Sequence, residues 1–565
     1  MSKSPATRPA VPTRGAGSPG VGAALSVLVP LTILLGLIWR FDFLVDDAFI
    51  AFRYAVNWAS GEGLRYHLGS ATPVEGFSDP LWVALLALGK LLGCAPELAA
   101  RALSVTCSVA CLLLLRHTLQ RDLSLGAGAV FLGTLFLATF TPAAVWATGG
   151  LETAAFSLAI LASWRLVAFG GGTLERSLAW LLPGILVGLR VEGLAWAMGL
   201  CLITRQGKAS REATGMERNP RRTFLIAALL AGALLTAARL WWFGEAVPNT
   251  VHAKSGFSLE VLQRGLRTLA SFGLVHLSVP LIALLFPLTQ RSPQRGPARS
   301  AGLMLLGLAT WNILVGGDWM PFFRFLAPAA PFLALLLAIS LDARMLPGAH
   351  RRFGPWPLGL FACALSLAPA FGWHPIPREW RAAMNFRSFR TGYQTELERW
   401  QTGVRNVENF TRIGLGLAQV ERSDATLVAG AIGALGFYSG AHILDRNGLV
   451  EARIARGPVT ETRSAGHDKR VPRSFFIADR PTWYEVLFVD HEITGGRFDA
   501  FRRATAILHG RVFADRSEAA LLDCTQAVAY PLRAEGPIPG GSSLILLQHT
   551  DDEQIARDFW SGFGP

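Results

Sequence analysis

VGAALSVLVPLTILLGLIW, residues 21–39, leads directly into RFDFLVDDAFIAFRY, residues 40–54, and this second stretch contains the adjacent carboxylates Asp46 and Asp47. The first stretch is long enough to cross a bilayer. It is too long for the apolar core of a signal peptide and has no clear cleavage site of small residues, so we expect a retained anchor. A carboxylate pair at a membrane surface is costly unless it has a function or bonding partners. The pair therefore indicates an integral membrane protein whose chemistry lies on the external face.

The composition also favours a membrane protein. Of the 565 residues, 51% are hydrophobic and 16% are charged, whereas a soluble protein carries about a quarter charged residues. The net charge of +13 does not indicate nucleic-acid binding, because the basic residues cluster in short loops between apolar segments, as in the cytoplasmic loops of membrane proteins. The six cysteines are scattered, and their spacing matches neither a disulfide framework nor a metal site.

Further apolar runs alternate with basic loops along the chain. These runs cover 97–116, 125–147, 151–169, 177–203, 223–243, 264–289, 300–316, 325–342 and 355–372. All basic loops lie in the cytoplasm if two of the apolar segments, 80–93 and 177–203, do not span the membrane. The run 80–93 is short and predicts a helix at the membrane interface. The run 177–203 starts and ends beside basic loops and has Arg190 and Glu192 at its centre, so we expect two half-helices that meet in a hairpin.

The sequence thus predicts a polytopic α-helical membrane protein with a C-terminal extracytoplasmic α/β domain. Its expected parts are a disordered cytoplasmic N-terminus (1–20), a transmembrane catalytic domain (21–372) with an external loop over 40–96, and a soluble extracytoplasmic domain (373–565). In the last part, β-like runs at 425–430, 441–445, 483–489 and 542–548 alternate with helical stretches. The glycines of 430–436 are spaced GxxGxxG, which favours a structural turn over a nucleotide-binding loop.

The same topology places five polar segments on the external side. They are the Asp46 loop, 148–153, the hairpin tip 188–193, 248–254 and 316–324. Acidic and cationic side chains from well-separated parts of the chain are therefore expected to line one external cavity.

Several of these segments resemble motifs of the C-type membrane glycosyltransferases, and among them most closely the mycobacterial terminal β-(1→2)-arabinofuranosyltransferases and their bacterial relatives. The resemblance begins with the run Val45–Asn57, Gly61-Glu-Gly-Leu64 and Pro73–Trp82. It continues through Gly150-Leu-Glu-Thr153, Leu189–Gly193, Pro248-Asn-Thr250, Ala253-Lys254, Gly317-Asp318, Arg324-Phe-Leu326, Tyr438-Ser439, Asp445–Leu449 and Gly466-His467. The hairpin reads Arg-Val-Glu where relatives often have Arg-Pro-Glu, so its helix break must have another origin.

The resemblance implies a sugar donor linked through phosphate to a polyprenyl lipid, an acceptor glycan or other hydroxyl compound of the cell envelope, and a place in the bacterial inner membrane. The leaving phosphate needs cations rather than a general acid, whereas the acceptor hydroxyl needs a base. Attack opposite the phosphate would invert the anomeric centre.

The candidate residues follow from these roles. For catalysis they are Asp46 and Asp47; for the donor phosphate, Lys254, Arg324, Arg190 and His252; for acceptor or sugar, Arg53, Glu75, Glu152, Glu192, Asn249 and Asp318. No cofactor is certain. Asp47 or Asp318 are candidates to hold a divalent metal, although no ligand spacing demands one.

Each candidate also has a structural interpretation. Asp46 or Asp47 can cap a helix that begins near Ala48. Arg53 can neutralise the aspartate pair, and Glu75 can hydrogen-bond to loop backbone.

Ion pairing offers a second structural interpretation for the remaining charged candidates. Glu152 can favour the positive N-terminus of the helix that follows it. Arg190 can pair with Glu192, and Asp318 can pair with Arg324 across their turn.

Other functions remain open at this point. A lipid-linked sugar transporter or flippase would also need polar hairpins, but the chain has no evident inverted repeats. A non-catalytic assembly factor would use the external domain to bind polysaccharide or protein. A protein or lipid O-glycosyltransferase would share the fold and differ in its acceptor.

Overall fold

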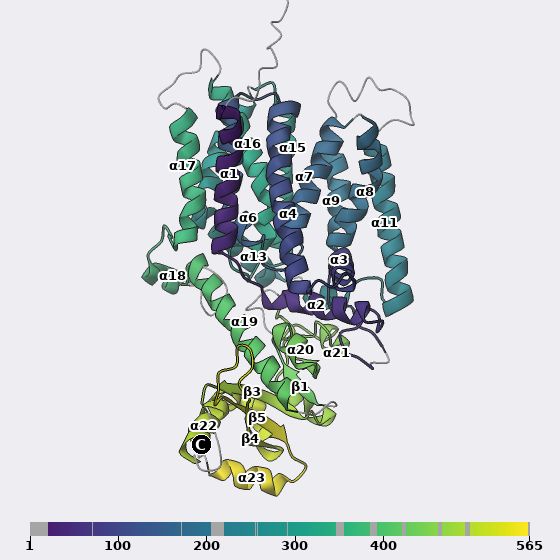
Figure 1. Cartoon of the computed structure of the whole chain (residues 1–565), viewed down its shortest axis with the longest axis vertical. Helices are drawn as coiled ribbons and strands as arrows, with labels where there is room; N and C mark the ends of the chain where they lie inside the picture. Colours follow the sequence, from purple (N-terminus) through teal and green to yellow (C-terminus); the bar gives the residue numbers. More distant parts are fainter. Residues whose placement is uncertain are drawn as a thin grey trace, which may run out of the picture.

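The computed structural model describes residues 21–69, 72–170, 172–204, 220–254, 256, 258–290, 292–345, 355–384, 393–420, 425–460, 466–491 and 498–562. The predicted disordered segment 1–20 lies outside the described residues. Figure 1 shows a bundle of helices at one end of the molecule and an α/β domain at the other, with helix α2 lying across the end of the bundle between them.

The helices of the bundle and its loops follow the predicted apolar runs. They are α1 (Val21–Arg40), α2 (Asp46–Ala59), α3 (Pro80–Leu91), α4 (Pro96–His117), η1 (Thr118–Asp122), α5 (Ala127–Thr139), α6 (Thr141–Val145), α7 (Thr153–Phe169), α8 (Thr173–Leu189), α9 (Gly193–Ile203), α11 (Pro220–Phe243), α12 (Asn249–Lys254), α13 (Leu259–Val275), α14 (Ser278–Thr289), α15 (Arg295–Leu314), η2 (Arg324–Ala329), α16 (Ala330–Met345), α17 (Pro355–Leu367) and η3 (Ala368–Phe371).

Several of these helices are suited to cross a membrane. Within the described residues, three helical stretches are individually long and apolar enough, Pro96–Asp122, Pro220–Phe243 and Arg324–Ala343, and one bent pair raises the number to four. Shorter apolar helices stand beside them in the bundle (Figure 1).

The predicted hairpin of 177–203 corresponds to helices α8 and α9. The break falls at Arg190-Val-Glu192, and the two helices pack side by side (Figure 1). A Cβ atom at Gly193 would lie 2.0 Å from the carbonyl oxygen of Leu186, so only glycine allows the chain to turn this tightly without proline. This close approach explains how the helix breaks at an Arg-Val-Glu sequence.

The apolar run 264–289 forms a bent pair of helices and not one straight helix. Helices α13 and α14 meet at an angle of 84° around His276. One face of α13 is polar, and its Arg264 forms a buried ion pair with Asp468 of the C-terminal domain, with N–O distances of 2.6 and 3.0 Å. The bend therefore directs α13 toward the C-terminal domain.

The C-terminal domain is built around a five-stranded mixed sheet. Its strands are β1 (Thr426–Ala429), β2 (His442–Asp445), β3 (Trp483–Val489), β4 (Thr525–Pro531) and β5 (Ser543–His549), in the order β2-β1-β3-β5-β4. Strand β1 is parallel to β2 and β3, whereas β5 is antiparallel to β3 and β4. Four strands match the predicted runs, and β4 was not predicted.

Helices cover both faces of this sheet. The helices of the domain are α18 (Arg378–Met384), α19 (Glu396–Gln419), α20 (Ala434–Ser439), α21 (Ala452–Ala455), η4 (Arg473–Asp479), α22 (Phe498–Phe513), η5 (Arg516–Asp523) and α23 (Glu553–Ser561). Along β5, Leu544 and Leu546 face the core shared with α19, whereas Ile545 and Leu547 face the core formed with α22 and α23. The continuous apolar run of β5 thus reflects burial on both sides.

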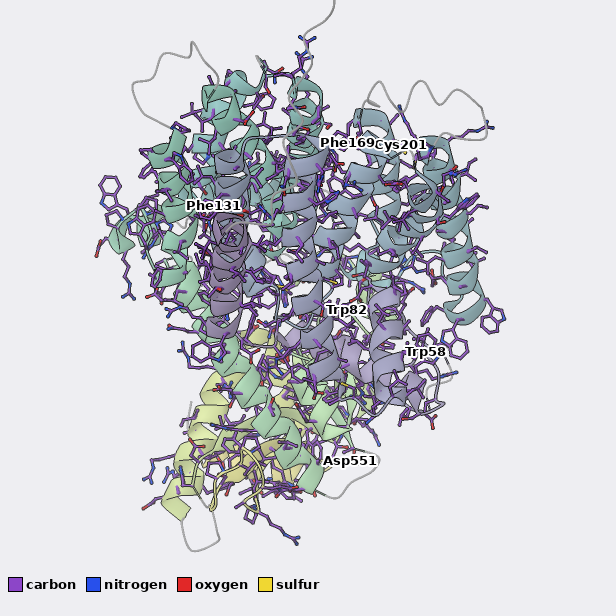
Figure 2. The ribbon with its side chains drawn as sticks, turned by 45° about the horizontal axis from the view of Figure 1, so that its top comes forward. Trp58, Trp82, Phe131, Phe169, Cys201 and Asp551 are labelled. Atoms are coloured by element: carbon purple, nitrogen blue, oxygen red, sulfur yellow. The ribbon has the colours of Figure 1, made fainter. Side chains whose placement is uncertain are left out.

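The domain contacts the bundle at the end where α2 lies. Arg53 of α2 donates to the carbonyl oxygens of Gly436 (2.6 Å) and Ala441 (3.1 Å). Asn249 donates to the carbonyl oxygens of Gly448 and Leu449. Trp58 and Trp82, labelled in Figure 2, mark the end of the bundle where these contacts form.

Candidate active site

Four of the five predicted external segments line one cavity of about 40 Å³ between α2, the start of α7, α12 and η2. Its polar lining comes from Asp47, Ser78, Asp79, Glu152, Thr250, Lys254 and Arg324, and Leu449 of the C-terminal domain closes it. The fifth segment, the hairpin tip, reaches the cavity wall indirectly, through an ion pair between Arg190 and Glu152.

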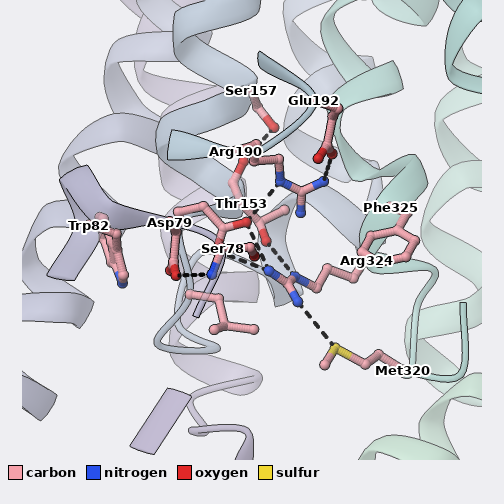
Figure 3. Close-up of polar contacts among 12 residues, drawn as sticks. Ser78, Asp79, Trp82, Thr153, Ser157, Arg190, Glu192, Met320, Arg324 and Phe325 are labelled. Carbon is pink, nitrogen blue, oxygen red and sulfur yellow. Dashed lines mark hydrogen bonds and ion pairs between the residues drawn. The ribbon is translucent and has the colours of Figure 1, made fainter. Parts of the chain in front are cut away.

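Glu152, just before the start of α7, lies between Arg190 and Arg324. Figure 3 shows these two arginines, with Glu192 beside Arg190 and Met320 beside Arg324. The carboxylate of Glu152 accepts from Nε of Arg190 at 2.8 Å and from one terminal nitrogen of Arg324 at 2.8 and 2.9 Å. Arg190 also contacts Glu192 at 3.2 Å. The predicted Arg190–Glu192 pair is therefore present, but it belongs to a larger network. The two guanidiniums and the two carboxylates balance in formal charge, so the network orients Arg324 without adding net positive charge.

Arg324 does not pair with Asp318, so that interpretation is wrong. Besides Glu152, Arg324 donates to the hydroxyl of Thr153 at 3.2 Å and lies 3.8 Å from the sulfur of Met320. Asp318 instead accepts the backbone N–H groups of Met320 (2.9 Å) and Phe325 (3.0 Å). It thereby shapes the turn that presents Arg324.

Asp79 lines the cavity and was missed by the sequence analysis. It precedes Pro80 at the start of α3, a position typical of a helix cap, but its side chain makes no capping bond. One oxygen accepts from the backbone of Ser78 at 3.3 Å, and the other has no partner among the described residues. Burial, followed by the charge of Glu152, raises the pKa of Asp79, which favours its neutral form.

Lys254 is the cation whose side chain is most open to the cavity. It ends helix α12, and although many atoms surround it, the side chain keeps an exposed surface because it faces the cavity space. Burial lowers the pKa of Lys254, and the nearby Asp47 opposes this shift. His252, on the same helix, is not among the described residues that line the cavity.

The two adjacent aspartates have different surroundings. The carboxylate of Asp46 accepts hydrogen bonds from the backbone nitrogens of Gly433 (3.2 Å) and Ala434 (2.8 Å). A Cβ at position 433 would lie 1.8 Å from the backbone oxygen of Asp46, so the predicted Gly-rich turn is a docking element that requires glycine there. Burial raises the pKa of Asp46 to about 6.

The carboxylate of Asp47, in contrast, makes no hydrogen bond or ion pair with any other residue that the structure describes. It lines the cavity of Lys254 and also a second, larger cleft under the C-terminal domain. Helix α2 begins at Asp46 with Val45 as its N-cap, and no side chain caps it, so the prediction that an aspartate caps this helix is wrong.

Three other candidates have partners that account for them structurally. Arg53 binds backbone of the C-terminal domain instead of neutralising the aspartates. Glu75 forms an ion pair with Arg239 of α11, both oxygens lying 3.0 Å from Nε, and does not bond loop backbone. Asn249 links the loop that contains Glu75 to the C-terminal domain. Its backbone N–H donates to the carbonyl oxygen of Glu75, while its side chain donates to the domain.

The described residues contain no group of three or more His, Cys, Asp or Glu side chains arranged to hold a metal ion. Asp318 is a poor metal candidate for a further reason, since both of its oxygens accept backbone N–H groups. Asp47 and Asp79 remain the cavity carboxylates with uncommitted oxygens, and two ligands are fewer than metal sites usually have.

Comparison with solved structures shows the fold. The chain is similar to ArnT from Cupriavidus metallidurans in its apo state, with a TM-score of 0.52 and 16% identity over 93% of this chain and 97% of that chain. It is also similar to ArnT bound to undecaprenyl phosphate, with a TM-score of 0.50, 15% identity and the same shares covered. A family model described as a domain of unknown function, DUF8728, matches residues 393–526. No curated protein matches the chain.

These likenesses establish the fold class. The chain is a multi-pass membrane protein with a C-type glycosyltransferase-like fold and a C-terminal α/β domain, so the fold prediction is confirmed. The narrower resemblance to the arabinofuranosyltransferases stays a prediction.

Proposed function

We propose that this protein is a glycosyltransferase that moves a sugar from a polyprenyl-phosphate donor to a hydroxyl acceptor at the external face of the bacterial inner membrane. One observation carries the proposal. The unbonded carboxylate of Asp47 shares a cavity with the cations Lys254 and Arg324. Transfer of a sugar from a phosphate donor requires a base for the acceptor hydroxyl and cations for the leaving phosphate, and both must face the same cavity.

The donor phosphate would be bound by Lys254 and by the terminal nitrogen of Arg324 that does not contact Glu152. The Arg190–Glu152–Arg324 network holds the Arg324 guanidinium in one orientation, which prepares it for the charge that grows as the phosphate leaves. Undecaprenyl phosphate is the ligand of one ArnT structure with this fold, and this supports a donor of the same lipid class.

The transfer step would start with removal of the acceptor proton by Asp47. The acceptor oxygen then forms a bond to the anomeric carbon, while the bond from that carbon to the phosphate oxygen breaks and the phosphate leaves with the electron pair. Attack opposite the phosphate inverts the anomeric centre. The family resemblance does not fix the sugar or the acceptor, and it offers arabinofuranose and a cell-envelope glycan as the candidates to test.

Reconstitution would test this proposal. The purified protein in nanodiscs is given polyprenyl-phosphate donors carrying different sugars, including arabinofuranose, and mass spectrometry identifies both the lipid that co-purifies and the glycosylated product. We expect transfer to an added hydroxyl acceptor that is lost in the variant Asp47→Asn. Movement of the donor lipid across proteoliposomes without any sugar transfer would instead support a transporter.

A further inference from the structure

A second cleft adjoins the cavity at Asp47, between α19, the 319–321 turn and the loops of the C-terminal domain. Its volume is about 170 Å³. Asp47 lines both this cleft and the cavity of Lys254 and Arg324. A group bound in the cleft therefore lies beside the proposed base and next to the cavity of the phosphate-binding cations.

We propose that this cleft is the acceptor site and that it binds the end of an uncharged glycan. The proposal rests on the proposed function for the reaction, but it adds the place and the chemical class of the acceptor.

The lining matches the surface of a sugar. Amide side chains of Gln394, Asn406 and Asn447 face the cleft together with the indole of Trp319. A sugar ring has hydroxyl groups around its rim and C–H groups on its faces, so amides complement the rim and an aromatic ring complements a face. The rings of Trp319 and His467 meet edge to face, with their centroids 5.6 Å apart.

Asn447 gives the most specific indication of a ligand. Its side chain is 3% exposed, and its amide nitrogen donates to the carbonyl oxygen of Gly430. Its amide oxygen has no hydrogen-bond partner among the described residues, although it is buried beside the cleft. A buried acceptor without a donor is costly, and a sugar hydroxyl in the cleft would supply the donor.

The charges of the cleft disfavour an anionic acceptor. Two carboxylates, Asp46 and Asp47, line it against one guanidinium, Arg399, one nitrogen of which donates to the carbonyl oxygen of Trp319 at 2.7 Å, so the formal charge of the lining is negative. A phosphate or carboxylate would approach two carboxylates here, but an uncharged sugar hydroxyl would not. The domain side of the cleft, from Gln394 to His467, lies within the segment that matches DUF8728, so the inference gives that segment a role in acceptor binding.

Gly403 of α19 allows the cleft to be filled selectively. It lines the cleft, and a Cβ atom added there would meet no atom within 4 Å. Gly403→Trp should therefore occupy the cleft without disturbing the packing around it. Gly510→Trp is the matched control, because Gly510 of α22 is also helical, also open and outside the cleft.

Binding would be measured by fluorescence polarisation with the full chain in nanodiscs. The probes are labelled neutral fragments of arabinan, galactan and mannan, a Ser/Thr-rich unfolded peptide and, separately, undecaprenyl phosphate. We expect at least one neutral glycan to bind, its Kd to rise about tenfold or more in Gly403→Trp, and no change in Gly510→Trp. Undecaprenyl phosphate should bind all three proteins equally.

The outcomes separate this inference from the proposed function. If no neutral glycan binds the unsubstituted protein, the assignment of an uncharged glycan is wrong. It is also wrong if the peptide is the only probe whose binding is weakened by Gly403→Trp. If glycan binding is the same in Gly403→Trp, the assignment of the cleft is wrong. If glycan binding depends on the cleft but undecaprenyl phosphate does not bind at all, the inference stands and the proposed donor chemistry fails.

Discussion

The carboxylate of Asp46 accepts a hydrogen bond from the backbone nitrogen of Ala434 at 2.8 Å, across a separation of 388 residues. This bond joins the first helix after the membrane anchor to the C-terminal domain. It also separates the roles of two neighbouring aspartates, because Asp46 is used for docking while Asp47 stays open to both cavities.

The first prediction concerns the base. Asp47→Asn removes the proton acceptor while keeping its shape, so sugar transfer should fall about 10²- to 10⁴-fold with donor binding retained. Asp46→Asn should cost much less, since its remaining oxygen still accepts from Ala434. Initial rates and donor binding would be measured for both variants. A larger loss of rate in Asp46→Asn would identify Asp46 as the base.

A second prediction concerns the pH dependence of stability. Burial raises the pKa of Asp46 to about 6 from its ordinary value of 3.8, so between these two pH values the folded protein holds a proton that the unfolded chain has released. The contribution of Asp46 to stability is therefore greatest at low pH and declines as the pH rises through about 4 to 6.

Asp46→Asn removes this titration. The Tm of the variant relative to the unsubstituted protein should accordingly increase across the same pH window. Asp490→Asn, at an exposed position in the C-terminal domain, is the control and should give a constant difference. A constant difference for Asp46→Asn as well would show that this carboxyl does not titrate in the window.

Lys254 should contribute directly to donor affinity. Loss of one charge-assisted contact to a phosphate costs about 1.5–3 kcal/mol, so Lys254→Ala should raise the Kd for undecaprenyl phosphate roughly tenfold to a hundredfold. Lys90→Ala, which removes an exposed lysine from α3, should leave this Kd unchanged. Equal affinities for the two variants would remove Lys254 from the donor site.

Arg324 should affect stability as well as donor binding. Arg324→Ala removes one of the two guanidiniums that hold the buried Glu152, and we expect a destabilisation of about 1.5–3 kcal/mol. Arg324→Ala leaves the buried carboxylate of Glu152 with one counter-charge fewer, and Glu152→Gln removes that negative charge. The double variant should therefore be more stable than Arg324→Ala alone. Thermal unfolding in detergent would measure the difference. Strictly additive effects would contradict the coupling between the two residues.

The fifth prediction concerns topology. Alkaline phosphatase fused after residue 380 should be active, because the C-terminal domain is expected outside, whereas fusions within the basic segment 206–220 should be inactive. Activity from the latter fusions would overturn the topology, because it would put the most basic loop on the external face.

The elements that sequence patterns predicted well are those set by local periodicity. Strands β1, β2, β3 and β5 and the broken α8–α9 pair follow from alternating or interrupted apolar runs. The bend in 264–289 was missed because the run is apolar on average. Its signal lies in Arg264, Thr268 and Ser271, whose spacing places polar groups on one helical face.

At the candidate site, sequence reasoning found residues but not their partners. Glu152 and Arg324 were both chosen, yet their ion pair spans 172 residues and leaves no local pattern. Asp79 was overlooked because an aspartate before a proline at a helix start is typical of a cap. Asp46 is the aspartate that binds the C-terminal domain, because Gly433 and Ala434 donate to it. These two residues approach α2 only in the folded protein, so the sequence alone could not distinguish Asp46 from Asp47.

The ion pair between Arg264 and Asp468 bears on how the protein is made. Synthesis proceeds from the N-terminus, so α13 leaves the ribosome well before its carboxylate partner, which follows 204 residues later. Until then the arginine of α13 must stay hydrated at the membrane surface. Premature termination before Asp468 would leave a cation with no internal counter-charge, and a truncated chain of this kind would offer the quality-control proteases of the cell envelope an incompletely assembled surface to recognise.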